Sequence, residues 1–170
     1  MRSVFSVGIL TISDKGSRGE RVDTSGPEIE RLLRDFPAQV KVYEIVPDEE
    51  ELIARKLREY ADERNLDLIL TTGGTGLTPR DVTPEATRRV LDKEIPGIGE
   101  AMRAEGLKIT PHAMLSRAAA GLRCRSLIIN LPGSPRAVRE NLQVVLPVLK
   151  HALEKIKGDP ADCAALREGH

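Results

Sequence analysis

Hydrophobic residues follow two different periods along the chain, and each period predicts a different kind of element. Runs of aliphatic and β-branched residues predict strands at SVGILTIS (6–13), QVKVYEIV (39–46), LDLILTT (66–72), RSLIINL (125–131) and GLKIT (106–110). Between most of these runs, apolar residues recur every three or four positions, which is the spacing of one helix face. The chain therefore predicts strands and helices in alternation.

Two helices are predicted between the first three strands. PEIERLLRDF (27–36) has apolar residues at helical spacing, and a second helical stripe extends over 49–64. Asp48 followed by Glu51 resembles a capping box, so Asp48 is a candidate N-cap for that second helix.

Proline marks the starts of the later helices. One should begin at Thr83-Pro84, with Thr83 as the N-cap, and PGIGEAMRAEG (96–106) indicates a break followed by a short helix. The last helix begins at Ser134-Pro135, and Pro147 inside it should kink or split it.

Alternating strands and helices are typical of an α/β fold, here a three-layer αβα sandwich with a mostly parallel central sheet. The pattern extends over one domain, residues 1–157, followed by a C-terminal tail, 158–170. Ligands of such sheets bind outside the carboxyl ends of the strands. The unusual residues of this chain lie at those ends: Ser13-Asp14, Pro47-Asp48, GGTG (73–76) and PGSP (132–135).

The segment TTGGTGLTPRDVTPEAT (71–87) places three glycines directly after a buried strand. Glycines at that point let backbone N–H groups approach an anion, and a following helix N-terminus strengthens the effect. The spacing fits neither the dinucleotide-binding fingerprint nor the P-loop. A tight crossover in which the glycines only turn the chain is the alternative.

Two aspartates follow neighbouring strands and could share the same site. Asp81 lies five residues after Gly76, and Asp48 follows the second strand. Two unit charges about 4 Å apart repel by about 4 kcal/mol at an effective dielectric of about 20. A phosphate ligand beside a carboxylate therefore calls for a cation, and Mg²⁺ is the usual one. Alternatively, Asp81 caps a turn and Asp48 caps the helix over 49–64.

The composition of the 170-residue chain limits the classes of partner that it can be expected to bind. Aromatic residues make up 2% of it and the formal net charge is zero, so neither base stacking nor a global positive field favours nucleic acid. No apolar run approaches the roughly 18 residues of a membrane span, and the N-terminus lacks a signal-peptide pattern. Cys124 and Cys163 fit no metal spacing and are expected to be free thiols in a reducing, cytoplasmic compartment.

Five segments carry a family resemblance: SDKGSRGERVDTSGP, TTGGTGLTPRDVTPEAT, PGIGEAM, MLSRAAAGLR and LIINLPGSPRAVREN. In sequence and in order they resemble the molybdopterin adenylyltransferases of the Mog type, and the G domains of gephyrin and its plant counterpart. The similarity extends from about residue 5 to residue 157. The combination of GGTG, DVTPEAT and NLPGSP is highly specific.

The resemblance implies a molybdopterin-binding fold and transfer of AMP from Mg-ATP to the terminal phosphate of molybdopterin, with release of pyrophosphate. It assigns Asp48 and Asp81 as catalytic residues and as Mg²⁺ ligands. It places the nucleotide at Thr72, Gly73, Gly74, Thr75, Gly76, Pro132, Gly133, Ser134 and Pro135. It places the pterin near Ser13, Asp14, Ser116 and Arg117.

Basic residues near these motifs are candidates for further phosphate contacts. Arg80, Arg117 and Arg136 flank the loops that follow strands, and Lys15 and Arg18 lie in a polar loop that could order over the ligand. Histidines lie outside the motifs, and a phosphate nucleophile, already ionised at neutral pH, needs no general base.

The resemblance also implies a homotrimer and hand-over of the product to a molybdate-inserting protein. Composition and charge, as above, predict neither nucleic acid nor membrane as a partner. A carrier that binds molybdopterin with little catalysis is an alternative function. An oligomerising scaffold is a second one.

Overall fold

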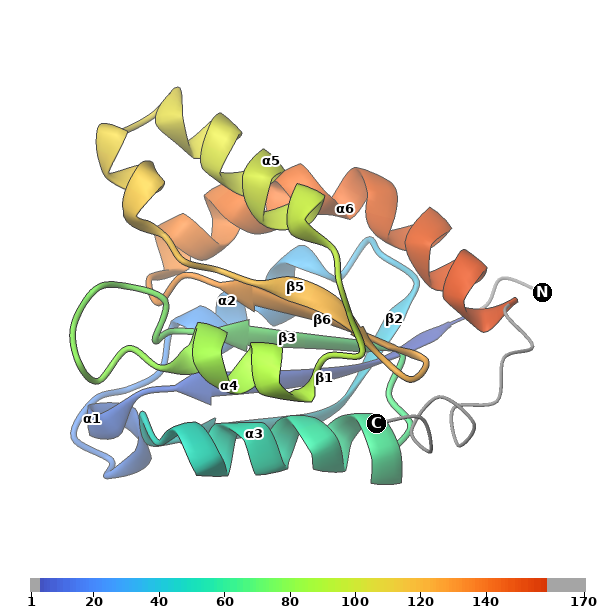
Figure 1. Cartoon of the computed structure of the whole chain (residues 1–170), viewed down its shortest axis with the longest axis horizontal. Helices are drawn as coiled ribbons and strands as arrows, with labels where there is room; N and C mark the ends of the chain where they lie inside the picture. Colours follow the sequence, from blue (N-terminus) through green and yellow to red (C-terminus); the bar gives the residue numbers. More distant parts are fainter. Residues whose placement is uncertain (1–3, 159–170) are drawn as a thin grey trace.

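Six strands form one sheet in the computed structural model, which describes residues 4–158 (Figure 1). In chain order they are β1 (Phe5–Ile12), β2 (Ala38–Val46), β3 (Leu68–Thr72), β4 (Lys93–Glu94), β5 (Ala120–Arg123) and β6 (Ser126–Leu131). They lie in the order β2-β1-β3-β6-β5-β4. The first four of that order are parallel, whereas β5 is antiparallel to β6 and to β4. The mostly parallel sheet predicted from the sequence is confirmed.

Helices cover both faces of this sheet. They are α1 (Asp14–Ser17), α2 (Ser25–Leu32), α3 (Glu50–Arg58), α4 (Thr83–Val90), α5 (Pro96–Leu107) and α6 (Pro135–Lys157), with a π-helical turn at Glu59–Glu63 and a 3-10 turn at Pro111–Leu115. Helices α2, α5 and α6 pack on one face, and α3 and α4 on the other (Figure 1). The three-layer αβα sandwich is therefore also confirmed.

The central strands are buried on both faces, which explains their continuous apolar runs. Successive side chains of a strand point to opposite sides, so Val7 and Ile9 enter the core under α2 and α6. Leu10 and Ile12 enter the core under α3 and α4. All five residues of β3 are buried. The central strands are therefore accessible only at their ends, and residues that follow their carboxyl ends can contact a ligand.

The predicted strand GLKIT (106–110) is wrong. Leu107 ends α5, and the N–H groups of Ile109 and Thr110 both bond the carbonyl of Gly106, which turns the chain out of the helix. The strands missed by the sequence reading are β4 and β5. AAAGLR lacks β-branched residues, so its composition does not favour a strand, although β5 pairs with the adjacent β6 as a hairpin. The two-residue strand β4 pairs with β5 from a distant part of the chain, with Lys93 opposite Leu122.

The two predictions about proline in later helices also need correction. Pro96 begins α5 directly, so 96–106 forms one continuous helix, without the break that was expected. Helix α6 continues through Pro147, which lies on its exposed side, so it is not split, whereas a kink there stays a prediction. The tail predicted over 158–170, apart from Gly158, and Cys163 within it lie outside the described residues. Across 4–158, no helix is long and apolar enough to cross a membrane.

A buried polar network joins β3, α4, β5 and β6 behind the site. The amide of Asn130 donates to the hydroxyls of Thr71 (3.0 Å) and Thr87 (2.9 Å), and its Oδ1 accepts from the N–H of Ala119 (3.1 Å). Thr87 in turn donates to the carbonyl of Thr83 at 2.8 Å. Each polar group is satisfied, so the network fixes α4 against the ends of two parallel strands.

We expect Asn130→Ala to lower the free energy of unfolding by about 2–4 kcal/mol, because it leaves buried donors and acceptors without partners. The control is Gln143→Ala on the exposed side of α6, which should change it by less than about 0.5 kcal/mol. Urea unfolding of both variants measures the difference. Equal stabilities would show that the network contributes little.

Candidate active site

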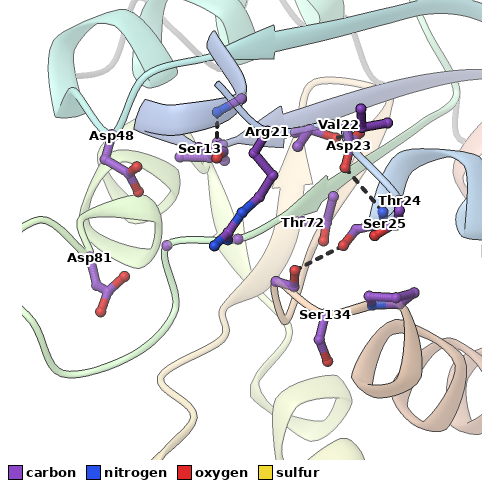
Figure 2. A pocket seen from close by; sticks show the side chains of 17 residues that line it. Ser13, Arg21, Val22, Asp23, Thr24, Ser25, Asp48, Thr72, Asp81 and Ser134 are labelled. Atoms are coloured by element: carbon purple, nitrogen blue, oxygen red, sulfur yellow. Dashed lines mark hydrogen bonds between the residues drawn. The ribbon is translucent and has the colours of Figure 1, made fainter. Parts of the chain in front are cut away.

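A cavity of about 540 Å³ opens at the carboxyl ends of β1, β3 and β6 (Figure 2). Parallel strands end at one edge of the sheet, so their following loops converge there. Of the residues predicted for the site, nine line this cavity: Ser13, Asp48, Thr72, Gly73, Gly74, Asp81, Gly133, Ser134 and Pro135. The other six, Asp14, Thr75, Gly76, Ser116, Arg117 and Pro132, are not among its lining residues.

The glycine turn after β3 has conformations that require glycine. Gly73 has φ +100° and Gly74 has φ +69°. A Cβ at Gly73 would lie 2.2 Å from the carbonyl oxygen of Ile12, and one at Gly74 would lie 2.2 Å from Oγ1 of Thr83. A Cβ at Gly133, in the loop after β6, would lie 3.3 Å from the Cα of Gly73. Three loops therefore meet in a space that admits only backbone.

Backbone groups of this turn divide into those that hold it and those that are left open. Thr83 donates its hydroxyl to the carbonyl of Gly73 (2.9 Å) and its N–H to the carbonyl of Gly74 (3.1 Å). The N–H groups of Gly74, Thr75 and Gly76 donate to no other residue among 4–158. Free N–H groups in a left-handed turn beside a helix N-terminus are typical of an anion site.

Thr83 is thus not the N-cap of its helix as predicted. Val82 precedes α4 as the cap residue and makes no side-chain cap bond. Thr83 is fully buried in the first turn, with its hydroxyl committed to the glycine turn. Its role is to tie α4 to β3.

Asp48 does not cap α3 either, because its carboxylate is engaged across the site. Asp48 Oδ2 accepts the N–H of Asp14 (2.9 Å), and Asp14 Oδ1 accepts the N–H of Asp48 (3.0 Å). The two aspartates therefore fix the ends of β1 and β2 to each other. Glu49 is the cap residue of α3, without a side-chain bond.

Asp14 is also paired with a cation from the third loop. Arg80 binds it through two hydrogen bonds, Nε to Oδ2 at 3.0 Å and an Nη to Oδ1 at 2.8 Å. Such a two-point arginine–carboxylate contact fixes geometry as well as charge. Asp14 therefore links Asp48 to the 77–82 loop, and the pterin contact predicted for Asp14 stays a prediction.

The two aspartates consequently have opposite pKa shifts. Burial raises the pKa of Asp48, and the nearby charges of Asp14 and Asp81 add to that rise. The hydrogen bond from Arg80 lowers the pKa of Asp14. Asp48 is thus a carboxylate whose charge the fold leaves incompletely compensated, which favours a cation beside it.

Asp81 brings the second carboxylate to the cavity. Its Oδ2 accepts from the N–H (2.9 Å) and the hydroxyl (2.8 Å) of Thr78, so it also caps its own turn, the alternative that the sequence left open. The Oδ1 atoms of Asp48 and Asp81 accept no hydrogen bond from the rest of residues 4–158. In Figure 2 the two carboxylates lie on the same side of the cavity.

This pair of open oxygens suits a divalent cation that takes its remaining ligands from phosphate and water. Mg²⁺ is commonly held by one or two carboxylates plus substrate phosphates. Within the described part of the chain, no group of three or more Asp, Glu, His or Cys side chains forms a metal cluster. An all-protein cage is therefore not what these residues offer, whereas a shared site with a phosphate is.

Arg117 lies behind the site and holds its loop. Its Nε donates to the carbonyl of Gly76 (2.8 Å), an Nη donates to that of Asp81 (2.7 Å), and the guanidinium also contacts Glu85. Its own N–H bonds the carbonyl of Thr75 at 3.0 Å. Arg117 and its neighbour Ser116 therefore sit next to the 75–81 loop, and pterin contact by either one stays a prediction.

Sequence reasoning gave no role to residues 21–25, which line the opposite wall. Asp23 accepts from the hydroxyl of Thr11 (2.7 Å) and from the N–H of Ser25 (3.0 Å). Ser25 donates its hydroxyl to the carbonyl of Gly133 at 2.8 Å. The usable signal was local, because aspartate followed two residues later by Ser-Gly is a common aspartate-capped turn.

The chain is thus a three-layer α/β domain whose cavity combines a glycine turn with two carboxylates. The particular family follows from comparison with known proteins. The chain belongs to the family described as "Probable molybdopterin binding domain", whose model matches residues 8–151.

Named relatives cover most of the chain. A molybdopterin adenylyltransferase of Helicobacter pylori is 46% identical over 90% of this chain and 88% of that protein. Gephyrin of Dictyostelium discoideum is 47% identical over 96% of this chain, which spans only 24% of that longer protein. Among solved structures, the molybdopterin biosynthesis enzyme MoaB of Thermus thermophilus is 58% identical, with a TM-score of 0.88 over 94% of this chain and 100% of that one.

Replacement of Gly73 tests the close approach of the loops. Gly73→Ala should lower the free energy of unfolding by about 2–4 kcal/mol, from a strained φ and contact with the carbonyl of Ile12. The control is Gly97→Ala in α5, where a Cβ would have no neighbour within 4 Å. It should leave stability equal or higher by up to about 1 kcal/mol. Chemical unfolding compares the two.

The opposite pKa shifts of Asp48 and Asp14 predict opposite pH behaviour. Asp48→Asn removes a charge whose pKa is raised, so it should stabilise the fold at neutral pH. That gain should shrink as pH falls through the raised pKa, because the native carboxyl then becomes neutral as well.

Asp14→Asn removes a carboxylate whose pKa is lowered, so it should destabilise at neutral pH, and the loss should fade as pH falls through the lowered pKa. The loss should be small, because the pair with Arg80 is partly exposed. Urea unfolding at neutral pH and at several lower values down to about pH 2 measures both variants. If both substitutions changed the free energy of unfolding in the same direction at neutral pH, the opposite pKa shifts of Asp48 and Asp14 would be contradicted.

Proposed function

We propose that this protein transfers AMP from ATP to the terminal phosphate of molybdopterin, releasing pyrophosphate. The observation that carries the proposal is a cavity lined by two carboxylates with open oxygens and by Gly73 and Gly74. These glycines begin a turn in which the N–H groups of residues 74–76 have no partner among residues 4–158. Two phosphate compounds and a cation have a place there. The proposal is also supported by the relative from Helicobacter pylori, which is named for this activity and is similar over nine tenths of the chain.

The reaction joins two anions, so its barrier is largely electrostatic and positional. An oxygen of the molybdopterin phosphate forms a bond to the α-phosphorus of ATP, and the bond from that phosphorus to the bridging oxygen of pyrophosphate breaks. The nucleophile is already ionised at neutral pH. The protein therefore has no proton to remove and must hold both phosphates in line.

We assign Asp48 and Asp81 to hold Mg²⁺ through their open Oδ1 atoms. When bound, this ion neutralises negative charge on phosphate oxygens and on the departing pyrophosphate. Asp14 and Arg80 keep Asp48 in position through the reciprocal backbone bonds. The fit rests on two carboxylates that lie in one cavity and keep open oxygens.

The nucleotide phosphates are assigned to the 73–76 turn and to the 132–135 loop. The turn offers the N–H groups of Gly74, Thr75 and Gly76, and the α6 N-terminus begins next to it at Pro135. The Thr72 hydroxyl donates to the carbonyl of Pro132 at 2.6 Å, so it joins the two loops. Ser13 is assigned to the pterin side, where it lines the cavity together with residues 21–25.

A homotrimer in the cytoplasm, with hand-over of the product to a molybdate-inserting protein, belongs to the same proposal. The trimer and the hand-over derive from the family resemblance, and the cytoplasmic location derives from the cysteine pattern of the sequence. The competing carrier function would use the same cavity for binding and would not depend on both aspartates.

Purified protein incubated with molybdopterin and Mg-ATP separates the two functions. We expect release of pyrophosphate, with a loss of about 10²–10³-fold in rate for Asp81→Ala and for Asp48→Ala, because each removes charge stabilisation from the transition state. Removal of divalent metal by a chelator should stop the reaction, and Mg²⁺ should restore it. The control is Asp35→Ala, an exposed residue in the turn before β2.

Asp35→Ala loses the same unit of charge outside the cavity and should retain full activity. If the native protein and both aspartate variants bind molybdopterin equally and the native protein releases no pyrophosphate, the carrier function is favoured. Full activity in Asp48→Ala and Asp81→Ala would contradict the proposed mechanism.

A further inference from the structure

The loop between α1 and α2 is held over the cavity at both ends. At its start, the N–H of Glu20 bonds the carbonyl of Lys15 at 2.9 Å. At its end, Asp23 accepts from Thr11 on β1, and Ser25 donates to the carbonyl of Gly133. The residues between these anchors therefore have a defined place along one wall of the site.

Arg21 lies between the anchors and carries the only positive charge among the described residues that line the cavity. Figure 2 shows its side chain extending from the loop into the cavity. It forms no hydrogen bond or ion pair with any residue in 4–158. A guanidinium that has no protein partner and faces a site for phosphates is free to bind one.

Four of the five basic residues that the sequence suggested for phosphate contact are committed elsewhere, and the fifth, Lys15, does not line the cavity. Arg80 binds Asp14, Arg136 binds Glu140, and Arg18 binds Glu20. Arg117 is used by backbone carbonyls and Glu85. None of these four lines the cavity.

Charge is also distributed suitably within the cavity. Asp48 and Asp81 suit a metal ion, and the carboxylate of Asp23 is used by Thr11, Tyr43 and two backbone N–H groups. None of these three carboxylates forms an ion pair with Arg21, so their charges leave the guanidinium uncompensated. The planar guanidinium fork matches a phosphate group in a two-point contact.

We propose that Arg21 binds a phosphate group of a substrate, as a residue that determines substrate affinity. This inference rests on the proposed function, since a phosphate must occupy the site. The phosphate belongs either to ATP or to molybdopterin. Separate measurements for the two substrates distinguish these sources.

The experiment compares the native protein with Arg21→Ala, Arg21→Lys and Arg18→Ala. Arg18 is the matched control, because it lies in the same segment, loses the same charge and is already paired outside the cavity. Calorimetry measures binding of Mg-ATP and of molybdopterin separately. Initial rates of pyrophosphate release give kcat and KM for each substrate.

Arg21→Ala should weaken binding of one substrate about ten- to a hundred-fold, through the loss of a charge-assisted hydrogen bond. The KM for that same substrate should rise by a larger factor than kcat falls. Arg21→Lys should restore part of the affinity, because it keeps the charge and loses the fork. Arg18→Ala should stay within about two-fold of the native protein.

Salt provides a second readout. Affinity of the native protein for the phosphate substrate should fall as ionic strength rises, and more steeply than that of Arg21→Ala. The inference is overturned if Arg21→Ala binds both substrates within about two-fold of Arg18→Ala. If the native protein releases no pyrophosphate, the proposed function fails, whereas the binding measurements still decide the role of Arg21.

Discussion

The site depends on the close approach of three backbones at the end of the sheet. Gly73 leaves β3 so near to the carbonyl of Ile12 that a side chain has no room, and Gly133 packs against it from the loop after β6. A left-handed turn follows at that point, and the N–H groups of Gly74, Thr75 and Gly76 have no partner among residues 4–158. The open N–H groups of this turn are thus a consequence of how tightly the parallel strands end together.

Polar side chains hold this arrangement because the glycines themselves contribute none. Thr83 ties the turn to α4, Thr72 ties it to the loop before α6, and Arg117 holds the carbonyls of the 75–81 loop. The Asn130 network fixes α4 from behind. Most of these groups are buried and satisfied, so they act as supports and not as ligands.

Charge at the site is divided between groups that stabilise the fold and groups that remain available. Arg80 neutralises Asp14, and that aspartate fixes Asp48 through a pair of backbone bonds. Asp48 is left with a raised pKa and one open oxygen beside Asp81. The uncompensated charges, two carboxylates on one side and Arg21 on the other, are those that a metal ion and a phosphate would complete.

The sequence by itself determined the fold class, the four parallel strands and the place of the site. Periodicity, glycine at the strand end and aspartates after strands are local features, so the residues 71–87 and Asp48 could be read directly. Which charged side chains remain free depends on the packed chain. Ion pairs such as Arg80–Asp14 join residues 66 positions apart, and Lys93 of β4 pairs with the distant Leu122 of β5. Local patterns therefore could not show that Arg80 is paired with Asp14 or that Arg21 faces the cavity, because both facts depend on residues brought together by packing.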